Sequence, residues 1–261
     1  MSDTPPPAPT VGELAAQAAA AQASGSAAPP RERPLVELRN VAVSYTEPNG
    51  ARVEVAQDLN LSLGRGEMVY LIGPTGSGKS TLLKMLYLDV RPEFGVVRVG
   101  PFQSDTTSEA DIPHLRRTLG IVFQDFQLLP DRSAYENVAF ALYATGKRGP
   151  EVKRRAMHAL AQVGLSHRAK ARPSEMSGGE QQRTCIARAI VNDPILLLAD
   201  EPTGNLDPTV ANEIQKLLLR LHRQGMALIM ATHDYRLIRD FPARTLALVR
   251  GELKPVDPAS L

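Results

Sequence analysis

The chain has 261 residues and a hydrophobic content of 43%, which is ample for one large globular domain or two small ones. Its 30 basic and 28 acidic residues leave a net charge of +2, so the composition lacks the basic excess by which proteins neutralise nucleic-acid phosphates. We therefore expect no nucleic-acid partner. The single cysteine, Cys185, cannot form a disulfide within the chain, which favours a reducing, cytoplasmic setting.

The first 34 residues contain ten Ala and seven Pro with few charges, and they lack the basic start and aliphatic stretch of a signal peptide. We expect a disordered Pro/Ala-rich tail over residues 1–34 without chemistry of its own. No segment approaches the roughly 20 apolar residues that span a bilayer, so we expect no membrane-crossing segment.

Regular structure is expected to start near Leu35, where the apolar alternation typical of a strand continues to Tyr45. Residues 46–50 have the composition of a turn. Two further strands, at 51–55 and 59–63, would complete a small antiparallel layer.

The apolar run 68–72 predicts a buried strand that leads into a glycine-rich loop and then a helix over 80–88. The loop, Gly73-Pro74-Thr75-Gly76-Ser77-Gly78-Lys79-Ser80, has the P-loop pattern in its required context. Its backbone N–H groups would bind phosphate oxygens, Lys79 would reach the β- and γ-phosphates, and Ser80 would ligate Mg²⁺. The expected phosphate-binding segment extends from Gly73 to Thr81. The alternative, a plain glycine-rich turn, does not account for this context.

The middle of the chain, about 125–191, loses strand-like runs and shows helical patterns, for example at 151–163 and 180–191, which predicts a helical insertion. Two parallel strands joined by a crossover helix, and a last strand, are then expected at 195–199, 226–232 and 245–249. The folded domain would span 35–253, followed by a C-terminal tail at 254–261.

Asp200 and Glu201 follow the buried run 195–199, at the strand edge where open α/β sheets bind ligands. Asp200 would hold Mg²⁺, and Glu201 would orient and polarise the attacking water. An acidic helix cap is the alternative. His233 follows the strand 226–232 and could contact the γ-phosphate, while Gln124, after the run 119–123, could contact Mg²⁺ or the water. Each of the latter two residues alone would more often be structural.

A second phosphate-binding helix start is indicated by Ser177-Gly178-Gly179-Glu180-Gln181-Gln182, because consecutive glycines at a helix start expose N–H groups. The order of P-loop, Gln124, this Ser-Gly-Gly segment, Asp200-Glu201 and His233 resembles that of ABC ATPase domains. The resemblance runs from about Leu35 to Leu253. The segment departs from the commonest signature, Leu-Ser-Gly-Gly-Gln, at Met176 and Glu180.

The resemblance implies an α/β P-loop fold with a mixed β core, a small antiparallel β layer and a helical signature subdomain. It implies Mg²⁺-dependent hydrolysis of ATP by Lys79, Gln124, Glu201 and His233, with Ser80, Gln124 and Asp200 around the metal. It also implies that Tyr45 stacks on adenine. Two copies would pack head to tail, so that the signature, Ser177 to Glu180, meets the ATP that the other copy holds.

The segments 112–129 and 131–138 closely resemble the FtsE family of bacterial cell-division ATPases. This resemblance implies an integral membrane partner, FtsX, and a peripheral location on the cytoplasmic face of the plasma membrane at the division site. ATP hydrolysis would drive a conformational signal to cell-wall hydrolases outside. A groove beside Gln124, with Phe126, Leu128 and Leu129, would receive the partner; the alternative for these three side chains is domain core.

Other functions stay open from the sequence. The ATPases of lipoprotein-release and macrolide-export systems share the patterns at 177–183 and 198–207, so these segments do not separate them from cell-division ATPases. A soluble ABC protein of translation or DNA repair would normally carry two such domains or long coiled-coil insertions. A module that binds ATP without hydrolysing it is disfavoured by Glu201 and His233.

Overall fold

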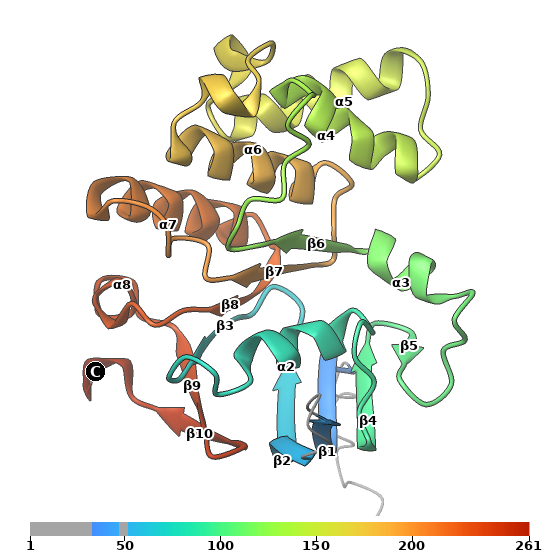
Figure 1. The fold of residues 1–261 in the computed structure, drawn as a ribbon, viewed down its shortest axis with the longest axis vertical. Coiled ribbons are helices and arrows are strands. Elements are labelled where there is room, and N and C mark those ends of the chain that lie inside the picture. The colour runs from blue at the N-terminus through green and yellow to red at the C-terminus, as the bar shows by residue number, and fades with distance from the viewer. Residues whose placement is uncertain (1–32, 47–51, 261) are drawn as a thin grey trace, which may run out of the picture. The chain divides into compact units, whose positions relative to one another are not determined.

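A computed structural model of the chain describes residues 33–46 and 52–260 (Figure 1). By its contacts the chain divides into two units, and the second, Pro34–Leu261, holds every helix and strand given below. The predicted tail at 1–34 and the predicted turn at 46–50 lie almost wholly outside the described residues. No helix in the described ranges is long and apolar enough to cross a membrane.

The first sheet is antiparallel and has the strand order β2-β1-β4-β5. Its strands are β1 (Val36–Thr46), β2 (Arg52–Leu63), β4 (Phe94–Val99) and β5 (Phe102–Gln103). The second sheet has the order β10-β9-β3-β8-β7-β6, in which only β10 is antiparallel. Its strands are β3 (Met68–Ile72), β6 (Leu119–Val122), β7 (Leu196–Asp200), β8 (Ala227–Ala231), β9 (Arg244–Val249) and β10 (Glu252–Val256).

Seven α-helices surround these sheets in the described part of the chain, and α4, α5 and α6 gather at the top of Figure 1, away from the antiparallel sheet. The helices are α2 (Lys79–Leu86), α3 (Ile112–Arg117), α4 (Ala134–Ala144), α5 (Pro150–Gln162), α6 (Gly178–Ile190), α7 (Pro208–Arg223) and α8 (Tyr235–Asp240). Short 3₁₀ turns occupy Ser166–Arg168, Pro173–Glu175 and Pro258–Ser260.

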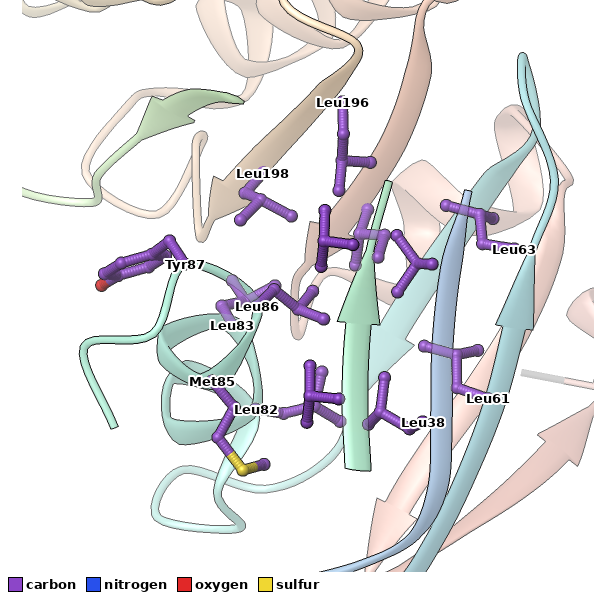
Figure 2. Close-up of a cluster of buried hydrophobic side chains, with 14 of the residues drawn as sticks. Leu38, Leu61, Leu63, Leu82, Leu83, Met85, Leu86, Tyr87, Leu196 and Leu198 are labelled. Atoms are coloured by element: carbon purple, nitrogen blue, oxygen red, sulfur yellow. The ribbon is translucent and has the colours of Figure 1, made fainter. Parts of the chain in front are cut away.

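The second sheet separates two hydrophobic cores, because successive side chains of a strand point to opposite faces. Val69 and Leu71 of β3 pack with α2 and the antiparallel sheet, whereas Tyr70 of the same strand packs with the helices of the other face. Figure 2 shows the first core, where leucines of α2 meet Leu196 and Leu198 of β7. Burial on both faces explains why β3 is a continuous apolar run. The end of β3, and hence the P-loop, is thereby fixed.

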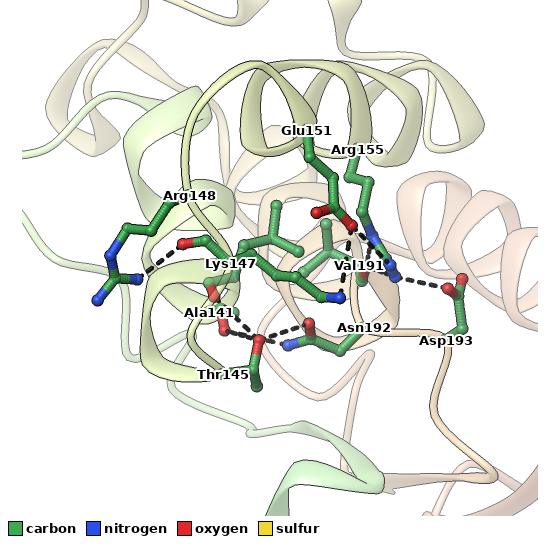
Figure 3. Close-up of polar contacts among 10 residues, drawn as sticks. Ala141, Thr145, Lys147, Arg148, Glu151, Arg155, Val191, Asn192 and Asp193 are labelled. Atoms are coloured by element: carbon green, nitrogen blue, oxygen red, sulfur yellow. Dashed lines mark hydrogen bonds and ion pairs between the residues drawn. The ribbon is translucent and has the colours of Figure 1, made fainter.

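Polar contacts tie the α4–α5 connection to the end of α6 (Figure 3). The Arg155 guanidinium donates to the Val191 carbonyl at 2.8 Å and pairs with Asp193 at 2.5 Å. Thr145 Oγ1 donates to Asn192 Oδ1 at 3.0 Å, and Asn192 Nδ2 donates to the Ala141 carbonyl at 3.1 Å. The contacts therefore tie the two helices α4 and α5 to the C-terminal end of α6, the helix that follows the Ser-Gly-Gly segment.

The structure corrects two sequence expectations. The separate strands predicted at 51–55 and 59–63 are one strand, β2, whose pairing with β1 shifts register at bulges. Asn40 and Asp58 take positive φ there, and Asn40 Nδ2 donates to Asp58 Oδ1 at 2.7 Å. The predicted tail boundary at 253 falls inside β10, which pairs with β9 as far as Val256. As an edge strand with mostly exposed side chains, β10 lacks apolar alternation.

Candidate functional site

The P-loop joins the end of β3 to the start of α2, and close packing requires two of its glycines, Gly73 and Gly78. A Cβ on Gly73 would lie 2.6 Å from the Leu248 carbonyl oxygen, and one on Gly78 would lie 2.5 Å from Val55 Cγ1. Gly78 is also the N-cap of α2, at φ 100°, a conformation that L side chains rarely adopt. The loop is therefore held against β9 and β2 at the start of α2, where the N–H groups of the first helical turn can meet an anion.

Lys79 is buried, with 6% of its surface exposed, and its side chain folds back over the loop. Its Nζ donates to the carbonyls of Gly73 at 2.8 Å and Pro74 at 3.2 Å. The same Nζ lies 3.7 Å from Glu201 Oε1. A cation so placed can exchange these neutral carbonyls for phosphate oxygens without leaving the loop.

Glu201 follows β7 and lies between a lysine and a histidine. Its Oε2 lies 2.7 Å from His233 Nδ1, while its Oε1 faces Lys79. Glu201 has φ 46°, and its N–H donates to the Ala231 carbonyl at 3.0 Å, which fixes the strained backbone. Non-glycine residues in this conformation concentrate at functional sites. The predicted pairing of β7 and β8 thus brings Glu201 and His233 together.

Asp200, one residue earlier, has an oxygen suited to a metal ion. Its Oδ1 is buried without a hydrogen-bond partner among the described residues. Burial raises the pKa of the Asp200 carboxyl, and a hydrogen bond from Ser80 opposes that shift. Mg²⁺ characteristically takes one or two carboxylates together with phosphate oxygens, so Ser80 and Asp200 fit this metal.

Gln124 follows β6 and faces the same site from its other side. Its carbonyl accepts a hydrogen bond from Asn205 Nδ2 at 3.1 Å, which links it to the loop after Asp200 and Glu201. Its amide is exposed.

One pocket of about 490 Å³ collects most of the predicted site. Its lining includes Tyr45, Thr75, Gly76, Ser77, Gly78, Lys79, Ser80, Thr81, Gln124, Glu201 and His233. Tyr45 is 53% exposed, as a residue available for stacking would be. Asp200 lines an adjoining hollow of about 440 Å³ together with Ser80 and Gln124.

The Ser-Gly-Gly segment does not line this pocket or the adjoining hollow. Ser177 caps α6 and forms a capping box with Glu180, whose carboxylate also accepts from Arg168 Nε at 2.9 Å. The backbone hydrogen bond from Ser177 is the main cause that lowers the pKa of Glu180. A Cβ on Gly179 would lie 2.6 Å from Val210 Cγ1, so α6 packs tightly on α7 there. The Ser-Gly-Gly segment is thus packed firmly into the domain, but it lies outside the pocket that the P-loop of the same chain lines.

Comparison with known proteins identifies the family. A family model described as ABC transporter matches residues 56–204. The chain is 47% identical to the cell division ATP-binding protein FtsE of Mycobacterium tuberculosis and 42% identical to that of Escherichia coli K12, each over 219 residues. These alignments cover 84% of this chain and 94% and 97% of those proteins. The chain belongs to the FtsE family of ABC ATPases.

Solved structures of ABC ATPase cassettes share the fold of this chain. An ATP-binding cassette, solved as a dimer in a post-hydrolysis state with ADP and Pi, has a TM-score of 0.76 and 34% identity over 85% of this chain and 98% of that one. The cbiO1 protein of Clostridium perfringens, part of the cbiONQ transporter complex, has a TM-score of 0.76 and 29% identity over 88% of this chain and 90% of that one. The predicted P-loop fold is confirmed.

As a member of the FtsE family the chain is a Mg²⁺-dependent ATPase of the cell-division type. The curated FtsE relatives, at 41–47% identity, favour this function over that of an exporter ATPase.

Three residues line the nucleotide pocket that the sequence did not indicate: Val55, Arg250 and Gly251. Val55 belongs to β2, and the other two form the turn between β9 and β10. The sequence did not show that this turn lies beside the P-loop, because strands far apart along the chain bring the two together.

Proposed function

We propose that this chain is the ATP-hydrolysing subunit of an FtsEX-like complex, acts as a head-to-tail homodimer, and drives a conformational change in an integral membrane partner resembling FtsX. That partner would regulate cell-wall hydrolases. The observation that carries the proposal is that Lys79, Glu201 and His233 share one pocket that contains no signature residue. A 34% identical relative, solved as a dimer, supports the two-copy arrangement.

In the proposed nucleotide site, backbone N–H groups of the P-loop from Gly73 to Thr81 bind the phosphates, and Lys79 moves from the Gly73 and Pro74 carbonyls to the β- and γ-phosphates. Tyr45, exposed at the pocket edge, stacks on adenine. Phosphoryl transfer depends mainly on positioning and charge stabilisation, which these groups provide.

Mg²⁺ would be held by Ser80, Gln124 and Asp200, and when bound it neutralises charge that develops on the phosphate oxygens. The unpartnered Asp200 Oδ1 supports its role as a ligand. Ser80, Gln124 and Asp200 line the same hollow, so the three side chains could share an ion.

Glu201 acts on the attacking water. One of its oxygens is held by His233 and the other faces Lys79, which leaves its carboxylate oriented at the γ-phosphate end of the pocket. Once Lys79 binds phosphate, Glu201 Oε1 can accept a proton from water. His233 holds the carboxylate through Nδ1, and its other ring nitrogen donates to the γ-phosphate when both ring nitrogens carry a proton.

The signature of one copy completes the site of the other. Ser177, Gly178 and Gly179 present the N-terminus of α6 to the γ-phosphate of the partner copy's ATP. Glu180 was expected among the nucleotide contacts, and here it is engaged in the capping box and with Arg168. We therefore assign Glu180 the role of holding Ser177 in place.

The membrane partner would dock beside Gln127, at the cytoplasmic face of the plasma membrane and at the division site. Two hollows of about 560 and 610 Å³ adjoin there, and the exposed ring of Phe140 lines both. Leu129 lines one of them, as the sequence suggested. Phe126 lines neither hollow, and its ring lies 3.9 Å from the Cβ position of Gly178 at the start of α6.

Co-purification with the membrane partner tests this proposal. Phe140→Glu places a charge in both hollows, so it should abolish co-purification while ATP-dependent dimerisation of the isolated chain persists. The control is Phe94→Glu, which changes an exposed phenylalanine of the antiparallel sheet. Equal recovery of the membrane partner with the two variants would contradict the proposed docking site at Phe140.

A further inference from the structure

Arg250 occupies a position that its side chain disfavours. Strands β9 and β10 are joined by a two-residue turn, Arg250 and Gly251, with Glu252 paired to Val249. Both turn residues have positive φ, 51° and 79°. Two-residue turns of this kind favour Asn-Gly or Gly-Gly, because a long side chain is strained in the left-handed region. A strained residue at a pocket is a reason to look for a function.

The turn cannot move away from the nucleotide pocket. Gln57 N–H donates to the Gly251 carbonyl at 2.9 Å, and a Cβ on Gly251 would lie 3.2 Å from Ala56 Cα. Val55 connects the turn to the P-loop, because its carbonyl lies 3.5 Å from the Cβ positions of both Gly251 and Gly78. The turn therefore lies beside the start of α2, at the foot of the P-loop.

The guanidinium of Arg250 has no fixed partner in the described part of the chain. Arg250 is exposed, makes no hydrogen bond or ion pair with a described residue, and lines the pocket together with Tyr45, Val55 and Lys79. In the proposed function Lys79 binds the β- and γ-phosphates, at the far end of the triphosphate. A second cation on the Tyr45 side faces the part of a nucleotide that Lys79 does not reach. Arginine suits that task since its planar fork binds phosphate oxygens in pairs.

We propose that Arg250 is a nucleotide-binding residue whose guanidinium contacts the α-phosphate of the bound adenine nucleotide. This assignment rests on the proposed orientation, with adenine at Tyr45 and the β- and γ-phosphates at the P-loop. The strain of the left-handed arginine is retained because the turn delivers its charge to that phosphate. Arg250 thereby supplies affinity rather than hydrolysis.

The variant Arg250→Asn tests the proposal without endangering the fold, because Asn-Gly is a preferred sequence for this turn. We expect its thermal midpoint to equal or exceed that of the parent. Its affinity for Mg²⁺-ADP and Mg²⁺-ATP should fall about 3- to 30-fold, as expected for loss of a charge-assisted contact near solvent. The nucleotide affinity of Arg250→Lys should lie between those of the parent and Arg250→Asn. Arg65→Asn is the control, since Arg65 is exposed in the turn before β3, at the end of that strand away from the P-loop.

Three comparisons decide the outcome. Lys79→Ala must lose ATP binding; if it does not, the proposed site itself is wrong, whatever Arg250 does. If Lys79→Ala loses binding while Arg250→Asn binds ADP as tightly as Arg65→Asn, the role of Arg250 is overturned. Adenosine affinity should be the same in Arg250→Asn and the parent. An equal loss for adenosine and ADP would overturn the phosphate contact.

Discussion

His233 Nδ1 lies 2.7 Å from Glu201 Oε2, on a carboxylate whose other oxygen lies 3.7 Å from Lys79 Nζ. The two contacts hold Glu201 from both sides. Binding of a phosphate by Lys79 would remove one of them and leave the histidine contact in place. The account therefore predicts separate effects on binding and on hydrolysis.

Glu201→Gln should lower ATP hydrolysis at least about 100-fold, because the amide cannot accept the proton of the attacking water. ATP binding should remain near that of the parent. Steady-state phosphate release and nucleotide titration measure the two effects. Glu109→Gln, on an 82% exposed side chain, is the control. Hydrolysis by the Glu201 variant at the parental rate would refute the assigned role.

Asp200→Asn should change how stability depends on pH. Burial raises the folded-state pKa of Asp200 above its ordinary value of 3.8, so the charged form is disfavoured by folding. The cost is absent when pH is below the unfolded pKa and grows as pH rises through the folded pKa. In urea unfolding without nucleotide, the free energy of unfolding of Asp200→Asn relative to that of the parent should therefore increase between about pH 4 and pH 7. An equal difference in unfolding free energy between the variant and the parent at both pH values would contradict the raised pKa of Asp200.

Gly179→Ala should destabilise the domain by about 1–3 kcal/mol, because the new Cβ would lie 2.6 Å from Val210 Cγ1. Val210→Ala opens that space. The double variant should be more stable than the sum of the single effects by about 1 kcal/mol in denaturant unfolding. Gly178→Ala is a milder control, with Leu206 Cδ2 3.3 Å from its Cβ position. If the unfolding free-energy changes of the two single variants add exactly in the double variant, the contact between Gly179 and Val210 does not constrain the packing of α6 on α7.

Arg188→Ala should slow hydrolysis about 5- to 20-fold by releasing the segment after Gln124. Phe126 and Gln127 both have positive φ, and their carbonyls accept from Arg188 at 3.0 and 2.6 Å. Arg220→Ala also loses a hydrogen bond to a carbonyl, that of Gln162, and is the control. Phosphate release at saturating ATP compares them. Equal rates for the two variants would show that this segment needs no support from α6.

Elements with a strong apolar pattern could be predicted from the sequence, whereas short or partly exposed elements could not. Strand β3 occupies the predicted residues 68–72, because an apolar run buried on both faces is unambiguous. β4 and α3 were not predicted: β4 begins with exposed residues and α3 is a six-residue helix that starts at Ile112. Cys185 is buried, and burial raises the pKa of its thiol to about 12.

Most of the nucleotide pocket could be predicted, because motif residues follow strands that end at one edge of the sheet. The P-loop, Gln124, Glu201 and His233 all reach that edge. Arg250 could not be predicted, since its place depends on how β9 pairs with β3 and on the contact of its turn with β2. The role of Glu180 as a cap is visible in Ser-x-x-Glu spacing, but the resemblance to the family drew attention to phosphate instead.

The central claim is that the signature of one copy serves the nucleotide pocket of the other. Ser177→Arg in a Glu201→Gln background tests it, with Ser133→Arg as a matched control because Ser133 caps α4 with the same kind of capping box. Analytical ultracentrifugation with ATP should show a dimer for the control and a monomer for the signature variant. A single copy of either variant should bind ATP with the same affinity. An ATP-dependent dimer of the signature variant, or a loss of ATP affinity in its monomer, would contradict the claim.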